Sequence, residues 1–246
     1  MEKESSSFDI MPYFAEGIGT FALIFFGAGC AALQTPGNSN QMLTVGFVFA
    51  LILFAIIAIW GDMSGANVNP VVSFVLALDQ RISPATCGGY VLAQFIGCVI
   101  AGALLLYIFG SGSSLGYTSG SLTVKNPTKA VVVELILTFI FVLVILVVTA
   151  PTEEKCNNDT TNASATIAFT LGLGVILGYT LTGGSLNPFR SLGPALFSGN
   201  LATIWIYFLG PIVGGLLAFI TYSVMFNKEI SNCYNYLHYL FLRGGL

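Results

Sequence analysis

The sequence carries one pattern twice, with the two copies 118 residues apart. Each copy holds an acid, a Thr-Phe pair four residues later and an Asn-Pro pair 53 residues after the acid. The members are Glu16, Thr20, Phe21, Asn69 and Pro70 in the first half, and Glu134, Thr138, Phe139, Asn187 and Pro188 in the second. An ionisable residue inside an apolar span is costly and usually faces the interior of a helix bundle. The repetition therefore needs a structural reason.

The composition is that of an integral membrane protein. Apolar residues make up 55% of the 246 residues and charged residues only 8%, whereas soluble domains carry about 25% charged residues. Six apolar stretches are long enough to cross about 30 Å of hydrocarbon as helices. We expect these spans at 13–33, 43–62, 85–109, 129–150, 164–182 and 201–226.

Three expected spans, an odd number, lie between equivalent points of the two copies. The second half therefore crosses the membrane upside down relative to the first, and inverted repeats place their site near the midplane on broken helices. We expect an all-α membrane protein with six transmembrane helices and two re-entrant half-helices. One membrane domain is expected at 13–226, with repeats at 13–109 and 129–226, between tails at 1–12 and 227–246.

The half-helices are predicted from the residues around each Asn-Pro pair. Asn is a good N-cap, and Pro is preferred at the first helical position. Asn69-Pro70 therefore begins a short helix that ends at Asp79, and Asn187-Pro188 begins its twin at 189–197. Each helix is about half a span long, so the two are expected to enter from opposite faces and meet at the midplane.

Polar, glycine-rich loops precede both half-helices, at 61–68 and 183–186. Non-helical backbone at membrane depth survives only where it is buried in protein or lines water. We therefore expect a pore lined by the carbonyls of Gly65, Ala66, Asn67, Gly183, Gly184 and Ser185. Glu16 and Glu134 are expected to accept hydrogen bonds from the loop of their own half; pairing only with each other or with water is the alternative.

The two Asn-Pro starts, the two Glu-x-x-x-Thr-Phe segments and the run Asn-Pro-x-Arg-Ser-x-Gly-Pro-Ala at 187–195 resemble the aquaporin (major intrinsic protein) family over residues 12–226. The resemblance implies a homotetramer with a separate pore in each subunit. Asn69 and Asn187 would donate to passing water. The two helix N-termini, each with roughly half a positive charge, would repel cations and hydronium, as half-helix dipoles do in aquaporin-type pores.

The resemblance places the selectivity filter at Phe49, Val175, Gly184 and Arg190. Phe and Arg match the water-selective pattern, whereas Val175 replaces a histidine and is expected, together with Gly184, to widen the constriction. Val71 and Phe189 stand where the family has alanine after each proline. Phe189 is expected to shift the contact between the half-helices or to narrow the middle of the pore.

Other positions resemble the water-channel branch more than the aquaglyceroporins; these are Ser191, Ala195, Tyr207 and Phe208. The expected function is a passive water channel that excludes protons and ions, with some permeability to small neutral solutes left open. The alternative is an aquaglyceroporin-type channel for glycerol, urea or ammonia. A more remote alternative is an occluded structural or junctional membrane protein. A coupled transporter is disfavoured, since only Glu16 and Glu134 are ionisable candidates at the midplane.

Several classes of function find no support in the sequence. The one histidine, His238, lies near the C-terminus, and the five cysteines have no metal-binding spacing, so no enzyme, metal or cofactor is expected. Charge is sparse and the net charge is −3, which argues against nucleic acid. The expected partners are water, small neutral solutes, the lipid bilayer and further copies of the chain.

The distribution of Lys and Arg predicts the orientation, because cytoplasmic loops carry an excess of both. With the N-terminus inside, the cytoplasmic set is Lys3, Arg81, Lys155, Lys228 and Arg243, and the outer set is Lys125 and Lys129. Both termini are therefore expected in the cytoplasm. The plasma membrane is favoured over an intracellular membrane.

Overall fold

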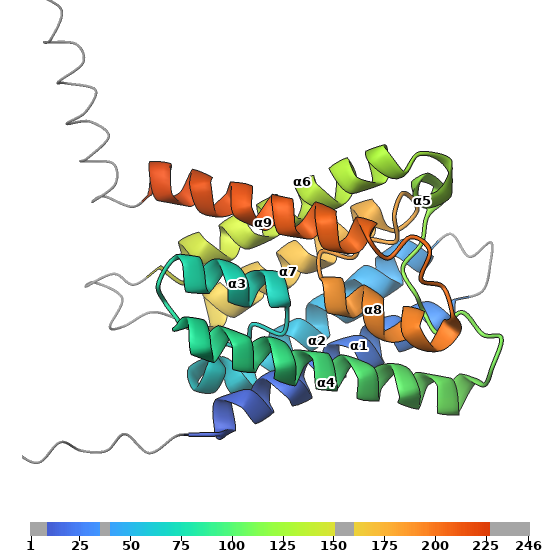
Figure 1. Cartoon of the computed structure of the whole chain (residues 1–246), viewed down its shortest axis with the longest axis horizontal. Coiled ribbons are helices and arrows are strands. Elements are labelled where there is room, and N and C mark those ends of the chain that lie inside the picture. Colours follow the sequence, from blue (N-terminus) through green and yellow to red (C-terminus); the bar gives the residue numbers. More distant parts are fainter. Residues whose placement is uncertain (1–8, 35–39, 151–159, 227–246) are drawn as a thin grey trace, which may run out of the picture.

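The computed structural model describes residues 9–34, 40–150 and 160–226, which form helices and no strand (Figure 1). In chain order the elements are α1 (Met11–Ala32), α2 (Gln41–Ser64), α3 (Pro70–Leu78), α4 (Pro84–Phe109), α5 (Ser121–Lys125), α6 (Pro127–Val148), α7 (Thr160–Gly178), α8 (Pro188–Ser198) and α9 (Ile206–Met225). The all-α prediction is confirmed. The expectations for residues 1–8, for 227–246 with His238, and for Lys155 lie outside the described residues.

Five described helices are long and apolar enough to cross a membrane: α1, α2, α4, α6 and α9. The sixth expected span corresponds to α7, whose apolar part, Asn162–Gly178, is shorter. We expected this span to reach residue 182, but it ends at Gly178 because the amides of Leu181, Thr182 and Gly183 all bond to the Gly178 carbonyl in a turn. Residues 202–205 also form a turn rather than the start of the last span.

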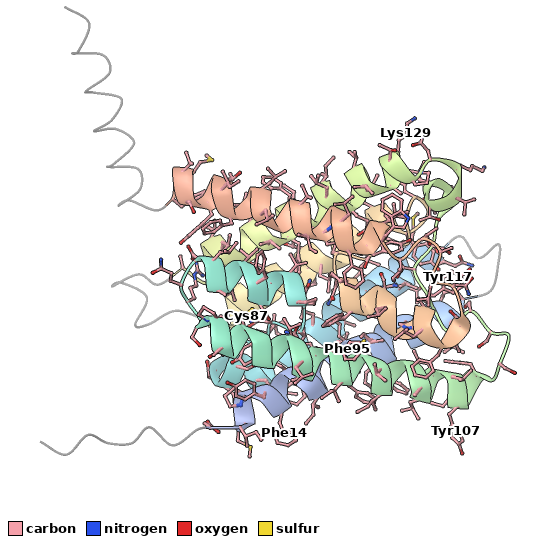
Figure 2. All side chains as sticks on the ribbon, viewed as in Figure 1. Phe14, Cys87, Phe95, Tyr107, Tyr117 and Lys129 are labelled. Carbon is pink, nitrogen blue, oxygen red and sulfur yellow. The ribbon has the colours of Figure 1, made fainter. Side chains whose placement is uncertain are left out.

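The packing of the helices repeats between the two halves. α1 packs on α2 and α4, and its equivalent α6 packs on α7 and α9. Each half-helix lies against a long helix of the other half, α3 on α9 and α8 on α4, while α2 crosses α7 (Figure 1). Large apolar side chains such as Phe14 and Tyr107 project from the outside of the bundle (Figure 2), as lipid-facing helices require.

Glycine permits the crossing of α2 and α7. A Cβ atom on Gly46 would lie 2.8 Å from the Gly172 carbonyl oxygen, and a Cβ on Gly172 would lie 2.9 Å from that of Gly46. Small residues allow such close backbone approach between helices in membranes. The two halves therefore meet backbone to backbone at this point.

Candidate functional site: a pore at the meeting of two half-helices

Both half-helices begin where the sequence predicts. Asn69 caps α3 by accepting a 3.0 Å hydrogen bond from the amide of Val71. Asn187 caps α8 by accepting from the amides of Phe189 and Arg190, at 3.0 and 3.3 Å. The N-termini of α3 and α8 point toward each other at the middle of the molecule (Figure 1), so the positive ends of both helix dipoles converge there.

The capping side chains also bind each other's loops. The Asn69 Nδ2 donates to the Leu186 carbonyl at 2.9 Å, and the Asn187 Nδ2 donates to the Val68 carbonyl at 2.8 Å. Val68 and Leu186 adopt positive φ angles of 44° and 55°, a conformation that branched side chains rarely take. An amide NH₂ group has two N–H donors, so this bond leaves each Asn with a second donor.

Two buried acids hold the loops in this conformation. Glu16 accepts hydrogen bonds from the amides of Asn67 and Val68, both at 2.8 Å, and from the Ser64 hydroxyl at 2.8 Å. Its side chain also accepts from Gln94 Nε2 at 2.7 Å. These bonds provide partners for backbone amides that would otherwise be buried and unpaired, which is costly.

Glu134 makes the equivalent bonds in the second half. It accepts from the amides of Ser185 and Leu186 at 3.0 and 2.9 Å, and from the Thr182 hydroxyl at 2.6 Å. Tyr207 adds a bond without a counterpart, since its hydroxyl donates to the Thr182 carbonyl at 2.6 Å. Each acid therefore bonds to its own loop, rather than only to the other acid or to water.

One small cavity joins the Asn-Pro motifs to the expected filter. Its volume is about 10 Å³, close to the space that one water molecule requires. The lining residues are Leu23, Phe49, Leu53, Asn67, Val68, Asn69, Phe141, Leu171, Ser185, Asn187 and Arg190. Eight of these form pairs related by the 118-residue repeat: Leu23 with Phe141, Leu53 with Leu171, Asn67 with Ser185 and Asn69 with Asn187.

The four expected filter residues lie in two contacting pairs. The guanidinium carbon of Arg190 lies 4.9 Å from the centre of the Phe49 ring, within cation–π range. A Cβ on Gly184 would lie 2.8 Å from the Val175 Cα. Only Phe49 and Arg190 line the cavity. The space that Gly184 leaves is occupied by α7 backbone, so Gly184 does not widen this cavity, and the widening expected from Val175 stays a prediction.

The residues after the prolines point away from the cavity. The Phe189 ring packs edge-on against Phe95 of α4, with ring centres 5.8 Å apart. Val71 packs toward α9, where a Cβ on Gly215 would lie 2.5 Å from its Cγ1. Neither residue lines the cavity. The expected narrowing by Phe189 is therefore absent, because the second position of α8 faces the neighbouring helix.

Of the six residues expected to line the pore with carbonyls, only Asn67 and Ser185 line this cavity. The loops aim the carbonyls of Val68 and Leu186 at the opposite Asn instead. The sequence analysis did not predict the apolar lining residues, although the pairs Leu23–Phe141 and Leu53–Leu171 have the 118-residue spacing of the repeat. It also missed Thr118, which accepts a hydrogen bond from Arg190 Nη1 and follows α4 in a loop without any repeated motif.

Two opposed half-helices in an inverted bundle define a multi-pass membrane channel. The model of the family described as major intrinsic protein matches residues 2–222, and the chain belongs to this family. Members of the family are channels, which carry water and small solutes, and not enzymes.

Relatives bear the names of both branches of the family. The chain is 36% identical over 224 residues to glycerol uptake facilitator protein-like 6 of Lactiplantibacillus plantarum, covering 88% of this chain and 99% of that protein. It is 35% identical over 222 residues to aquaporin-5 of Mus musculus, covering 89% and 82%. The X-ray structure of the aquaglyceroporin from Plasmodium falciparum has a TM-score of 0.76 and 26% identity, covering 91% and 99%.

Proposed function

We propose that this chain is a passive water channel that excludes protons and ions. The observation that carries the proposal is the cavity of about 10 Å³ between the half-helix N-termini, lined by both Asn69 and Asn187. Each Asn already gives one N–H to the opposite loop, and the second N–H would be donated to the oxygen of a water molecule. The apolar side chains of Leu23, Leu53, Phe141 and Leu171 line other sides of the cavity and offer the water no hydrogen bond.

Proton exclusion follows from the same geometry. A water that accepts hydrogen bonds from Asn69 and Asn187 turns its own hydrogens away from the motifs, which interrupts a chain of waters that could pass a proton. The positive ends of α3 and α8 add a barrier to hydronium and to other cations. Arg190, which is 3% exposed and lines the same cavity, adds a full positive charge.

The preference for water over larger solutes rests on Arg190 and Phe49. Their contact at 4.9 Å and the small cavity beside them favour a water molecule over a molecule of the size of glycerol. The second candidate is a glycerol, urea or ammonia channel, favoured by the relatives named for glycerol uptake and as an aquaglyceroporin. It would require Arg190 to move away from the Phe49 ring.

The assembly and orientation are part of the proposal. We infer that residues 13–226 form one channel domain with repeats at 13–109 and 129–226, and that four copies assemble with one pore each. Arg81 lies in the turn between α3 and α4, whereas Lys125 and Lys129 lie at the opposite end of the bundle (Figure 1). The proposed orientation places Arg81 and both termini in the cytoplasm, with the protein in the plasma membrane.

Stopped-flow light scattering on proteoliposomes tests the function. Water, glycerol, urea and ammonia are run in parallel on the same vesicles, with empty liposomes as the control. The proposal predicts water permeability well above the lipid background and glycerol permeability near it. Glycerol flux comparable to water flux would support the second candidate, and water permeability at the background would support an occluded structural protein.

A further inference from the structure

The side chain of Arg190 is held from a loop that precedes the second repeat. Its Nη1 donates to the Thr118 hydroxyl, and it lies 3.5 Å from the Gly116 carbonyl. Among the described residues its Nε has no hydrogen-bond partner. The position of the guanidinium over Phe49 therefore depends on bonds made at one end only.

Thr118 is the first of three linked hydroxyls. Its oxygen lies 2.7 Å from that of Ser191, and the Ser191 oxygen lies 2.6 Å from that of Ser185. Ser185 in turn donates to the Asn187 carbonyl at 2.8 Å. This chain of buried hydroxyls connects the expected filter to the second Asn-Pro motif.

The direction of every bond in the chain is fixed by its two ends. A guanidinium can only donate and a carbonyl can only accept. Thr118 therefore accepts from Arg190 and donates to Ser191, and Ser191 donates to Ser185. Hydrogen bonds aligned in one direction polarise one another, particularly where water is excluded. The acceptor that faces Arg190 is consequently stronger than an isolated hydroxyl.

The loop that carries Thr118 leads into α5, whose first two amides bond to the turn that precedes the second Asn-Pro loop. The amides of Ser121 and Leu122 donate to the carbonyls of Thr180 and Leu181, both at 2.9 Å. A Cβ on Gly183 would lie 2.7 Å from the Thr118 methyl carbon, so the glycine leaves the space that this side chain fills. Thr118 is thus held in place by backbone bonds and by packing.

The first half contains an equivalent serine with different hydrogen-bond partners. Ser73, the repeat equivalent of Ser191, accepts from Asn67 Nδ2 at 3.1 Å and from Gln94 Nε2 at 2.9 Å. Gln94 links this serine to Glu16, and the equivalent of Arg190 is Val72. The serine position is therefore duplicated, but only the second half connects it through Thr118 to a charge at the pore.

We propose that Thr118 is the positioning residue that keeps Arg190 over Phe49 and thereby sets the solute cutoff of the pore. The inference rests on the proposed function of Arg190 and Phe49 as the filter. Removing the hydroxyl frees the guanidinium to leave the ring and opens the constriction. The capping bonds and the cross-loop bonds of Asn69 and Asn187 do not involve Thr118, so the part of proton exclusion that rests on these two residues and the helix dipoles remains.

Three variants test this inference in full-length protein in proteoliposomes. Thr118→Val removes the hydroxyl at constant shape, and the ratio of glycerol to water permeability should rise by about tenfold, as expected for the loss of one hydrogen bond to a charged group. Thr118→Ser restores the hydroxyl and should keep the wild-type ratio. Thr138→Val is the matched control, because Thr138 is fully buried and, within the described ranges, its hydroxyl has no partner.

A structure of the Thr118→Val variant by electron cryo-microscopy separates this inference from the proposed function. Arg190 displaced from Phe49 supports the positioning role, whatever the protein transports. Arg190 still over the ring, or an unchanged permeability ratio in Thr118→Val, would overturn it. Wild-type water flux at the lipid background would refute the proposed function, while the position of Arg190 in the variant would still decide the role of Thr118.

Discussion

The side-chain amide of Asn69 donates a 2.9 Å hydrogen bond to the carbonyl of Leu186, a residue 117 positions away in the opposite half of the chain. The side-chain amide of Asn187 donates the equivalent bond to the carbonyl of Val68. Each half therefore fixes the capping residue of the other, and the two half-helix N-termini form one structural unit. A change at either motif is expected to disturb both.

Asn187→Asp is expected to weaken ion exclusion. The carboxylate can still cap α8, but it cannot donate to the Val68 carbonyl and places a negative charge where two helix dipoles converge. Proton or sodium entry into vesicles should rise above the wild-type level, measured with a pH- or sodium-sensitive dye. Asn200→Asp, an exposed residue after α8, is the control. Equal leak in both variants would contradict the assignment of the barrier to the motif.

Glu134→Gln is expected to destabilise the protein. An amide offers one acceptor oxygen instead of two, so at least one of the donors from Thr182, Ser185 and Leu186 loses its partner. An unpaired buried donor costs about 1–3 kcal/mol. Thermal unfolding in detergent should show a lower Tm, whereas Asp62→Asn, at an exposed acid near the end of α2, should leave it unchanged. No difference between the two variants would remove Glu134 as the support of its loop.

Gly172→Ala is expected to loosen the crossing of α2 and α7. The added Cβ would lie 2.9 Å from the Gly46 carbonyl oxygen and 2.9 Å from the Ala50 Cβ, and overpacking of this kind costs about 1–3 kcal/mol. Gly88→Ala is the matched control, because a Cβ there meets nothing within 4 Å and alanine favours the helix. The first variant should unfold at a lower temperature and the second should not. The reverse order would contradict the close crossing.

Phe189→Ala is expected to reduce stability without changing selectivity. The ring packs on α4 beside Phe95 and does not line the cavity, and a buried Phe→Ala change costs about 3–5 kcal/mol. Unfolding temperature should fall while the ratio of glycerol to water permeability stays at the wild-type value. A raised ratio with unchanged stability would mean that the ring lies at the pore after all.

Local chemistry explains what could be predicted from the sequence. The starts of α3 and α8 follow from Asn at the N-cap and Pro at the first helical position, which act within a few residues. The inverted arrangement follows from counting spans between Glu16 and Glu134. These features depend only on neighbouring residues or on parity, and both are visible in a single chain.

Features that depend on the approach of distant backbones could not be predicted. Gly184 suggests a wide filter by its size, but its space is taken by the backbone of Val175. Phe189 suggests a narrow pore by its bulk, but the start of α8 turns the ring toward α4. Thr118 lies outside both repeats, and only the folded loop brings it to Arg190.

The most direct test of the central claim measures water and proton permeability in the same proteoliposomes. Osmotic shrinkage is followed by light scattering, and an imposed pH gradient is followed by an enclosed dye, with empty liposomes alongside. Water permeability well above the lipid background, together with a pH gradient that decays no faster than in empty liposomes, is the predicted result. Water permeability at the background, or a pH gradient that collapses in the vesicles that conduct water, would contradict it.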